Sequence, residues 1–272
     1  VTVAMHPRYR DMDNADLPHP LARETDIASY NYRYMYFPGD GERYPNMIFY
    51  QSEANTTGLP GNFFEMDRDK VVGLAYWGFI DYLGESHGWP RKGWCDGVFD
   101  ISLEPKPNAY LVRSMFKPEE PIVHIGIIDS KADNKEWNGI VFSNDGMSDH
   151  WNRVEGTKCS MNIFTNAEEV ELFVNGKSLG VKKNPAEPKS RNKIHWKDVE
   201  YHKGYIEAVA RNNGKVVARH KIETTGKATK LKVTADDIEW KVDGKDLQHV
   251  RVVAVDSKGR RVPDVNSHLR FR

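Results

Sequence analysis

The sequence has few of the features that mark metal-binding or membrane proteins. Its two cysteines, Cys95 and Cys159, lie far apart and outside any C-x-x-C spacing, so neither a zinc site nor a disulfide framework is predicted. Its ten histidines include no H-E-x-x-H motif, and we expect them to be structural. No apolar run approaches the roughly 20 residues that span a bilayer. We therefore expect a soluble protein with no metal and no cofactor.

An excess of charge of either sign is also absent. The 39 Lys and Arg residues balance 39 Asp and Glu residues, and no basic stripe or tail offers the surface that nucleic acids require. We expect neither a nucleic-acid partner nor a membrane partner. Aromatic residues, in contrast, reach 11%, which suits a surface that stacks on the flat apolar faces of sugar rings.

The two ends of the sequence lack the signals of a complete chain. It opens on Val-Thr-Val-Ala-Met, without an initiator methionine, a charged n-region or an apolar h-region. At the other end, Leu269–Phe271 begins a strand-like alternation where the sequence stops. We therefore expect a segment of a longer protein, and these residues carry no signal for its localisation.

Residues 1–117 predict βα units around a parallel sheet, because short apolar runs are separated by polar stretches long enough for helices. The expected strands are Thr2–Met5, Asp26–Tyr30, Met47–Gln51 and Val71–Trp77. Four such strands form half of a (β/α)8 TIM barrel, in which the active site gathers at the carboxyl ends of the strands. A half barrel leaves two open sheet edges, so we expect the remaining strands to come from elsewhere.

Residues 118–226 predict an antiparallel, immunoglobulin-like β-sandwich. The turns Asn175-Gly176 and Asn213-Gly214 suit tight hairpins, whose central residues need positive φ. The expected strands are Met161–Thr165, Val170–Val174, Tyr205–Ala210 and Val216–Ile222. Residues 227–272 predict the truncated start of a further immunoglobulin-like domain, with strands at Lys230–Ala235, Glu239–Val242 and Val250–Val255.

Candidate chemical residues follow the expected parallel strands. Glu53 follows one strand, where a barrel glycosidase places a catalytic carboxylate; the alternative is a helix cap or loop charge. Trp77 ends the next expected strand, and its side chain either forms a platform for a sugar ring or belongs to the core. Tyr32 follows the preceding strand, either donating a hydrogen bond to a neighbouring carboxylate or packing at the rim. Asp81 and Glu85 add two further carboxylates.

Several stretches together resemble glycoside hydrolase family 2, which contains β-galactosidases and β-glucuronidases. The residues that carry this resemblance are Asp26–Tyr34, Tyr44–Asn46 leading into Ser52-Glu53, Gly73–Glu85, Gly97–Asp100, Pro105–Pro107 and Asn166–Gly180. The order and strand context of these stretches match the family. The resemblance covers nearly the whole chain and identifies residues 1–117 with the C-terminal half of the family's barrel.

The resemblance implies a retaining exo-β-glycosidase that uses two carboxylates about 5–5.5 Å apart. By position, Glu53 is the nucleophile and Tyr32 its hydrogen-bonding neighbour. Asn31 is a polar contact at the rim, Trp77 the floor under the sugar, and Asp96 a group facing the sugar hydroxyls. For Asn31 and Asp96, a role in loop structure stays open. Glu85 is a further candidate for substrate binding, with salt bridging or capping as its alternative, as for Asp81.

One part of the family pattern is missing. The family's acid/base glutamate lies in an Asn-Glu dipeptide, and this sequence contains no Asn-Glu. Proton donation to the leaving group contributes about 10²–10⁴-fold to the rate. We therefore expect the parent protein to be a hydrolase and this chain to be inactive alone, unless the missing half of the enzyme or another copy in a homo-oligomer supplies the acid.

Specificity follows from the loop around Asp96. Glucuronidases of the family place Asn-x-Lys where this sequence has Trp94-Cys95-Asp96, and an aspartate there repels a uronic acid. We expect terminal β-galactosides of oligo- or polysaccharides as substrates, while Arg91 and Lys92 keep β-glucuronides and other β-glycosides open. The family resemblance implies a periplasmic or secreted parent.

A second hypothesis is a non-catalytic carbohydrate-binding or scaffold fragment. It needs exposed aromatic side chains on a sandwich face, such as Trp196 and Trp240. Together with Trp151, these are more typical of core residues. The catalytic hypothesis instead needs Trp77 beside Glu53.

Overall fold

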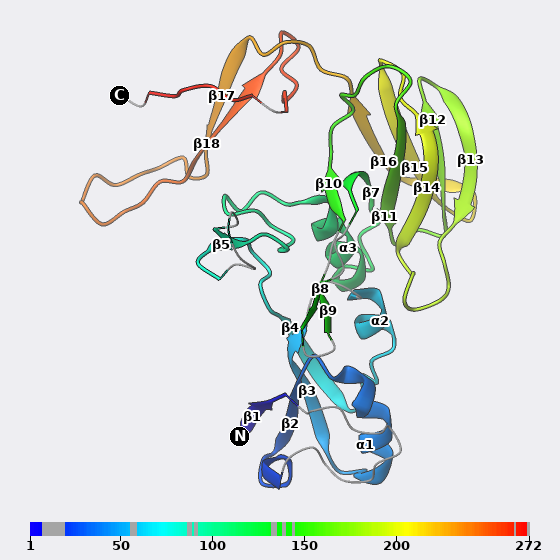
Figure 1. The fold of residues 1–272 in the computed structure, drawn as a ribbon, viewed down its shortest axis with the longest axis vertical. Helices are drawn as coiled ribbons and strands as arrows, with labels where there is room; N and C mark the ends of the chain where they lie inside the picture. Colours follow the sequence, from blue (N-terminus) through cyan, green and yellow to red (C-terminus); the bar gives the residue numbers. More distant parts are fainter. Residues whose placement is uncertain are drawn as a thin grey trace.

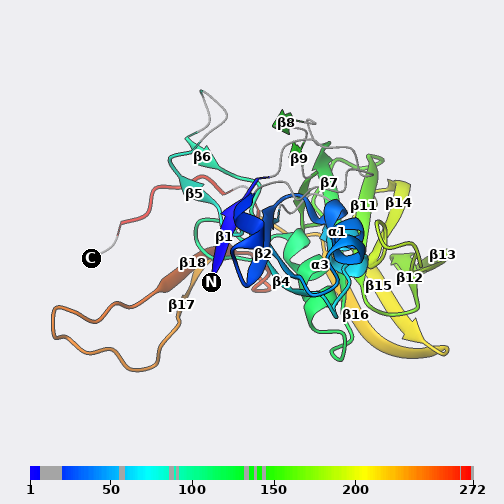
Figure 2. The same ribbon diagram turned by 90° about the horizontal axis from the view of Figure 1, so that it is seen from below.

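The structure is a computed structural model that describes residues 1–6, 20–54, 59–85, 89, 92–131, 135–137, 140–142, 145–263 and 265–270. Arg91, one of the two basic residues that keep glucuronides open, lies outside them. Figure 1 shows three parts: an N-terminal sheet with its helices, a β-sandwich, and a hairpin near the C-terminus. Figure 2 shows the hairpin on the opposite side of the molecule from the sandwich. No helix among the described residues is long and apolar enough to cross a membrane.

The N-terminal part is a four-stranded sheet in which all neighbours are parallel, in the order β1-β2-β3-β4. Its strands are β1 (Thr2–Met5), β2 (Ile27–Asn31), β3 (Ile48–Ala54) and β4 (Val71–Tyr76). The helices between them are η1 (Pro20–Arg23), η2 (Tyr34–Tyr36), α1 (Phe37–Arg43) and α2 (Leu59–Phe64). The four predicted strands are thus confirmed to within a few residues.

Aromatic packing holds α1 against this sheet. The ring of Phe37 lies 5.2 Å from that of Tyr30 on β2 and 5.1 Å from that of Phe49 on β3, centroid to centroid. The Tyr30 hydroxyl donates a 2.9 Å hydrogen bond to the buried Asp40 carboxylate on α1. This hydrogen bond joins two buried polar groups, as buried polar groups require. Together with the ring contacts, it packs α1 against one side of the sheet.

A loop region with the short strands β5 (Tyr82–Leu83) and β6 (Gly93–Trp94) leads from β4 to α3 (Pro107–Phe116). Proline suits the first position of α3, because the N–H that it lacks has no partner inside a helix. Leu111 and Met115 of α3 pack against Phe164 of the sandwich. Helix α3 therefore connects the N-terminal sheet to the sandwich.

The sandwich consists of two four-stranded antiparallel sheets, β10-β7-β11-β14 and β13-β12-β15-β16. Its strands are β7 (Val123–Ser130), β10 (Gly146–Ser148), β11 (Lys158–Thr165), β12 (Glu169–Val174), β13 (Lys177–Lys183), β14 (Lys193–Glu200), β15 (Tyr205–Asn212) and β16 (Lys215–Glu223), and β8 (Lys135–Trp137) pairs separately with β9 (Ile140–Phe142). Trp151 and Trp196 are buried in the shared core, as predicted. Positive φ at Asn175, Gly176, Asn213 and Gly214 confirms both predicted hairpin turns.

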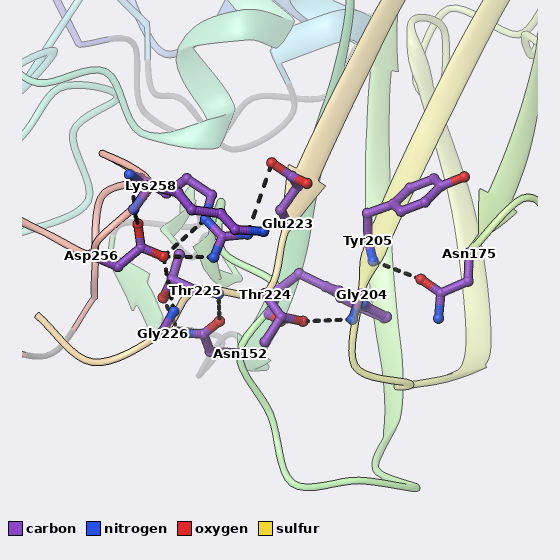
Figure 3. Close-up of polar contacts among 12 residues, drawn as sticks. Asn152, Asn175, Gly204, Tyr205, Glu223, Thr224, Thr225, Gly226, Asp256 and Lys258 are labelled. Carbon is purple, nitrogen blue, oxygen red and sulfur yellow. Dashed lines mark hydrogen bonds and ion pairs between the residues drawn. The ribbon is translucent and has the colours of Figure 1, made fainter.

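The C-terminal hairpin pairs β17 (Lys230–Ala235) with β18 (Val250–Val255). The predicted strand Glu239–Val242 is wrong, since these residues form no strand and Trp240 is 57% exposed rather than core. In the described chain β17 and β18 form a two-stranded sheet, and β18 has one further bridge, from Val255 to Arg261. Residues 239–242 therefore have no partner strand there. Asp256, directly after β18, links the hairpin to the segment that follows the sandwich, because its carboxylate accepts a hydrogen bond from the backbone N–H of Gly226 (Figure 3). The same carboxylate accepts a local bond from the N–H of Lys258.

Candidate active site

Three of the predicted site residues meet at one edge of the parallel sheet. Carboxyl ends of parallel strands share an edge, which is where α/β proteins bind ligands. Asn31, at the end of β2, pairs in register with Glu53 near the end of β3. Trp77 directly follows β4, and its backbone N–H donates a 2.8 Å hydrogen bond to the carbonyl oxygen of Ala54. The structure therefore brings Asn31, Glu53 and Trp77 together across three neighbouring strands.

Tyr32 contacts Glu53 twice. Its backbone N–H donates a 2.6 Å bond to the carbonyl oxygen of Glu53, and its hydroxyl donates to the Glu53 carboxylate. Burial and, next, this side-chain bond raise the pKa of Tyr32 far above its ordinary value. The phenol consequently stays protonated and acts as a hydrogen-bond donor to the half-buried carboxylate.

Asn31 is held by a protein partner. The Ser52 hydroxyl on β3 donates a 2.6 Å hydrogen bond to the side-chain oxygen of Asn31. The Asn31 side chain is half-buried, so part of it faces solvent at the edge that carries Glu53. The bond fixes which way the amide points at the rim of the sheet.

Trp77 is held from two sides by other aromatic rings. Its ring centroid lies 5.2 Å from that of Trp94 at an interplanar angle of 89°, and 6.0 Å from that of Tyr82 at 74°. The Trp94 indole N–H donates to the carbonyl oxygen of Gly78 at 3.0 Å. Because edge-to-face pairs are favourable for aromatic rings, Trp77 is fixed in orientation while remaining partly exposed.

Glu85 lies near the Tyr32–Glu53 pair. The Tyr82 hydroxyl donates a 2.9 Å hydrogen bond to Glu85, and burial together with this bond raises the pKa of Tyr82 to about 12. The charges of Glu85 and Tyr82 also contribute to the raised pKa of Tyr32. Glu85 itself is exposed, so its carboxylate combines a tyrosine partner with access to solvent.

The remaining two acidic candidates differ in environment. Asp81 forms an ion pair with Lys106 at 2.6 Å and accepts a 3.0 Å hydrogen bond from the N–H of Gly97. Its salt-bridging alternative is therefore confirmed. Asp96 is half-buried, two residues after the buried Trp94.

His6, expected to be structural like the other nine histidines, lies beside the candidate site. His6 directly follows β1, and its ring lies 6.3 Å from that of Tyr32 in an edge-to-face arrangement. The signal was present in the sequence, because His6 follows the first strand as Asn31 and Tyr32 follow the second. Among the residues that the structure describes, no group of three or more His, Cys, Asp or Glu side chains is arranged to hold a metal ion.

Comparisons with known proteins agree on one family. A β-galactosidase of Bacteroides ovatus is 33% identical over 210 residues, which are 75% of this chain and 21% of that protein. A solved glycosyl hydrolase family 2 member from Bacteroides cellulosilyticus superposes with a TM-score of 0.78 at 32% identity, over 87% of this chain and 32% of that one. The chain belongs to glycoside hydrolase family 2. Residues 156–218 also match the model of a domain of unknown function, DUF4982.

A relative named for a different sugar matches as well. A β-glucuronidase of Formosa agariphila is 29% identical over 208 residues, which are 73% of this chain and 18% of that protein. The chain thus spans about a fifth of the length of these two curated relatives. Its likeness extends to relatives named for galactosides and to relatives named for glucuronides.

Proposed function

We propose that this chain supplies the nucleophile side of a retaining exo-β-glycosidase, with Glu53 as the nucleophile. The observation that carries the proposal is the hydrogen-bonded pair of Tyr32 and Glu53 at the carboxyl edge of a parallel sheet. The Tyr32 hydroxyl is a neutral donor that orients this carboxylate without pairing it with a cation. This is the state that a carboxylate nucleophile requires.

The parallel sheet would be the C-terminal half of a (β/α)8 barrel. Its strands follow one another in sequential order, and helices connect β2 to β3 and β3 to β4. β1 and β4 are the two edges of the sheet in the described chain, so each offers unpaired backbone groups to further strands. Those strands, from the missing half of the enzyme or from another copy, would also bring the second carboxylate.

In the proposed reaction, an oxygen of Glu53 forms a bond to the anomeric carbon as the bond from that carbon to the leaving oxygen breaks. The second carboxylate, absent from this chain, gives the leaving oxygen its proton. Tyr32 donates its hydrogen bond to Glu53 before the attack and again when the ester is hydrolysed, since the carboxylate then re-forms. Trp77 provides an apolar surface beneath the sugar ring.

The proposed substrates are terminal β-galactosides of oligo- or polysaccharides. Asp96 disfavours a uronic acid, because two like charges would face one another. The β-galactosidase relative supports this choice. The alternative, a β-glucuronide, draws support from the Formosa relative and from Lys92, which is exposed in the same loop.

A non-catalytic carbohydrate-binding fragment is less well supported. Trp196 is 4% exposed and covered by Lys182, whose ammonium lies 4.8 Å from its ring centroid, so it offers no sugar platform. Trp77, in contrast, is partly exposed and adjoins the strand that carries Glu53. Trp240 is 57% exposed, which this alternative needs, but it lies between β17 and β18 rather than on a sandwich face. The partly exposed Trp77 beside the strand of Glu53 therefore favours the catalytic proposal.

The test uses a 2,4-dinitrophenyl 2-deoxy-2-fluoro-β-galactoside and intact-protein mass spectrometry. The dinitrophenolate leaves with the bonding electron pair and needs no proton, so the missing acid does not prevent attack by Glu53. We expect a covalent glycosyl adduct that peptide mapping assigns to Glu53, and none in Glu53→Gln. Glu200→Gln, a change at an exposed sandwich residue, is the matched control and should label like the unmodified chain.

Two further arms complete the test. A 4-nitrophenyl β-galactoside, whose leaving group depends more on protonation, should not turn over; turnover that disappears in Glu53→Gln would show that a general acid reaches the site. The glucuronic acid analogue of the labelling reagent should react more slowly than the galactoside. Absence of any adduct with either sugar would refute Glu53 as a nucleophile in this chain.

A further inference from the structure

His6 follows β1, at the same edge of the sheet as the candidate site residues at the carboxyl ends of β2, β3 and β4. Met5 pairs in register with Tyr30, so His6 lies one position further along, beside Asn31. Asn31 in turn pairs with Glu53. His6, Asn31 and Glu53 thus form a row across β1, β2 and β3.

Tyr32 adopts a backbone conformation that needs external support. Its φ is +60°, in the left-handed region that is unfavourable for an aromatic residue. Such a conformation persists only where surrounding contacts over-determine it. Two of those contacts come from Glu53, through the backbone and the hydroxyl bonds. The edge-to-face contact with His6 comes from outside the reacting pair.

The charge state of His6 suits a packing role beside a carboxylate. Burial, followed by the nearby Arg33 guanidinium, lowers the pKa of His6, and the Glu53 charge opposes this shift. The imidazole is therefore neutral at pH 7. A neutral ring does not draw the Glu53 carboxylate into an ion pair, so Tyr32 keeps its place as donor.

We propose that His6 is a positioning residue that holds the Tyr32 ring so that its hydroxyl faces Glu53. The inference rests on the proposed function, because its consequence is the reactivity of Glu53. His6 acts through Tyr32, and removing the Tyr32 hydroxyl should remove the effect of His6.

A double-mutant cycle on the 272-residue chain tests this dependence. The rate of Glu53 labelling by the dinitrophenyl fluorogalactoside is measured for the unmodified chain, His6→Ala, Tyr32→Phe and the double variant. We expect His6→Ala to slow labelling about tenfold, within the range of coupling between contacting side chains. In the Tyr32→Phe background, His6→Ala should change the rate by less than about twofold, since coupled effects are not additive.

Two variants separate positioning from general structure. His6→Phe retains a ring edge and should recover most of the labelling rate that His6→Ala loses. His202→Ala, a change at an exposed histidine of the sandwich, should label like the unmodified chain. With tyrosine labelled with ¹³C at Cζ, the Tyr32 resonance should shift in His6→Ala and return in His6→Phe, which reports the hydroxyl environment independently of reactivity.

The outcomes distinguish the two levels of the proposal. Labelling of Glu53 at the same rate with and without His6 would overturn the positioning role and leave the proposed function standing. An equal slowing by His6→Ala in both backgrounds would also overturn it, because His6 would then act without Tyr32. Absence of Glu53 labelling in the unmodified chain would overturn the proposed function and this inference together.

Discussion

A stack of three rings at the junction of α3 and the sandwich predicts that acid destabilises this fold. His124 on β7 lies between Tyr110 of α3 and His220 of β16, with centroid distances of 3.6 Å and 4.1 Å. The Nδ1 atom of His220 accepts a 3.0 Å hydrogen bond from the N–H of Ile125. Neutral His220 therefore carries its proton on Nε2. A second proton must go to Nδ1, which breaks the bond to Ile125.

The magnitude follows from the pKa of His220. Burial lowers it from 6.5 to about 4, with the Asp149 charge opposing the shift. Burial and the charge of His220 lower the pKa of His124 further, to about 2. Since the unfolded chain binds more protons than the folded one between pH 6.5 and 4, stability falls as the pH falls through this window. For His220 alone, the loss between pH 7 and pH 5 is about 2 kcal/mol.

Urea unfolding at pH 7 and pH 5, followed by the fluorescence of the buried tryptophans, measures this loss. His220→Asn places an oxygen acceptor near the position of Nδ1 and removes the titration. We expect this variant to be less stable at pH 7, because ring stacking is lost, but to lose about 2 kcal/mol less than the unmodified chain on going to pH 5. His268→Asn, at an exposed position, should leave the difference unchanged. An equal pH dependence in the unmodified chain and His220→Asn would refute the reasoning.

Three further predictions concern packing. Gly78→Ala should disturb the Trp77–Trp94 pair, because φ is +62° at Gly78 and the new methyl group would lie 2.5 Å from the Trp94 indole nitrogen. The near-ultraviolet circular dichroism spectrum should therefore change, and an unchanged spectrum would contradict this prediction. Trp151→Ala should lower the unfolding free energy by about 3–5 kcal/mol, measured in urea, since the side chain is fully buried; a loss below 1 kcal/mol would contradict it. Asp256→Asn should speed proteolytic cleavage near Gly226, because the carboxylate accepts a hydrogen bond from the backbone N–H of Gly226 in the segment between the sandwich and the hairpin. Unchanged cleavage would count against this prediction.

The strands that could be predicted from the sequence are those whose pattern is local. β4 is an apolar run that follows the polar segment 67–70, and β12 alternates up to Asn175-Gly176, where positive φ is needed. Both signals reside within a few residues, so they are visible without knowing the partner strand. The alternation at Glu239–Val242 has the same local form. It is not a strand, because strand formation also needs a neighbour.

Candidate site residues could be predicted from the sequence where they follow a strand. Their side-chain contacts could not, because these depend on residues distant in the sequence. Glu53 follows from the end of an apolar run. The different environments of Asp81 and Glu85 could not be predicted in this way, since both acidic residues come after the same predicted strand. Lys106, 25 residues after Asp81, pairs with it, whereas Glu85 is bound by the nearby Tyr82. The position of His6 after the first strand was visible in the sequence, but its contact with Tyr32 was not, because that contact depends on the pairing of β1 with β2.

The ion pair of Asp81 also gives a physical role to the sandwich. Lys106 binds Asp81 in the loop that follows Trp77, and it directly precedes Pro107, the first residue of α3. Pro107 in turn packs so closely on β7 that a methyl group at Gly126 would lie 2.8 Å from its Cβ atom. The loop that follows Trp77 is therefore tied, through one ion pair and one helix start, to a strand of the sandwich core. Such a tie should restrict the motion of an otherwise irregular loop, so the β-sandwich would help to keep Trp77, the proposed sugar platform, in place.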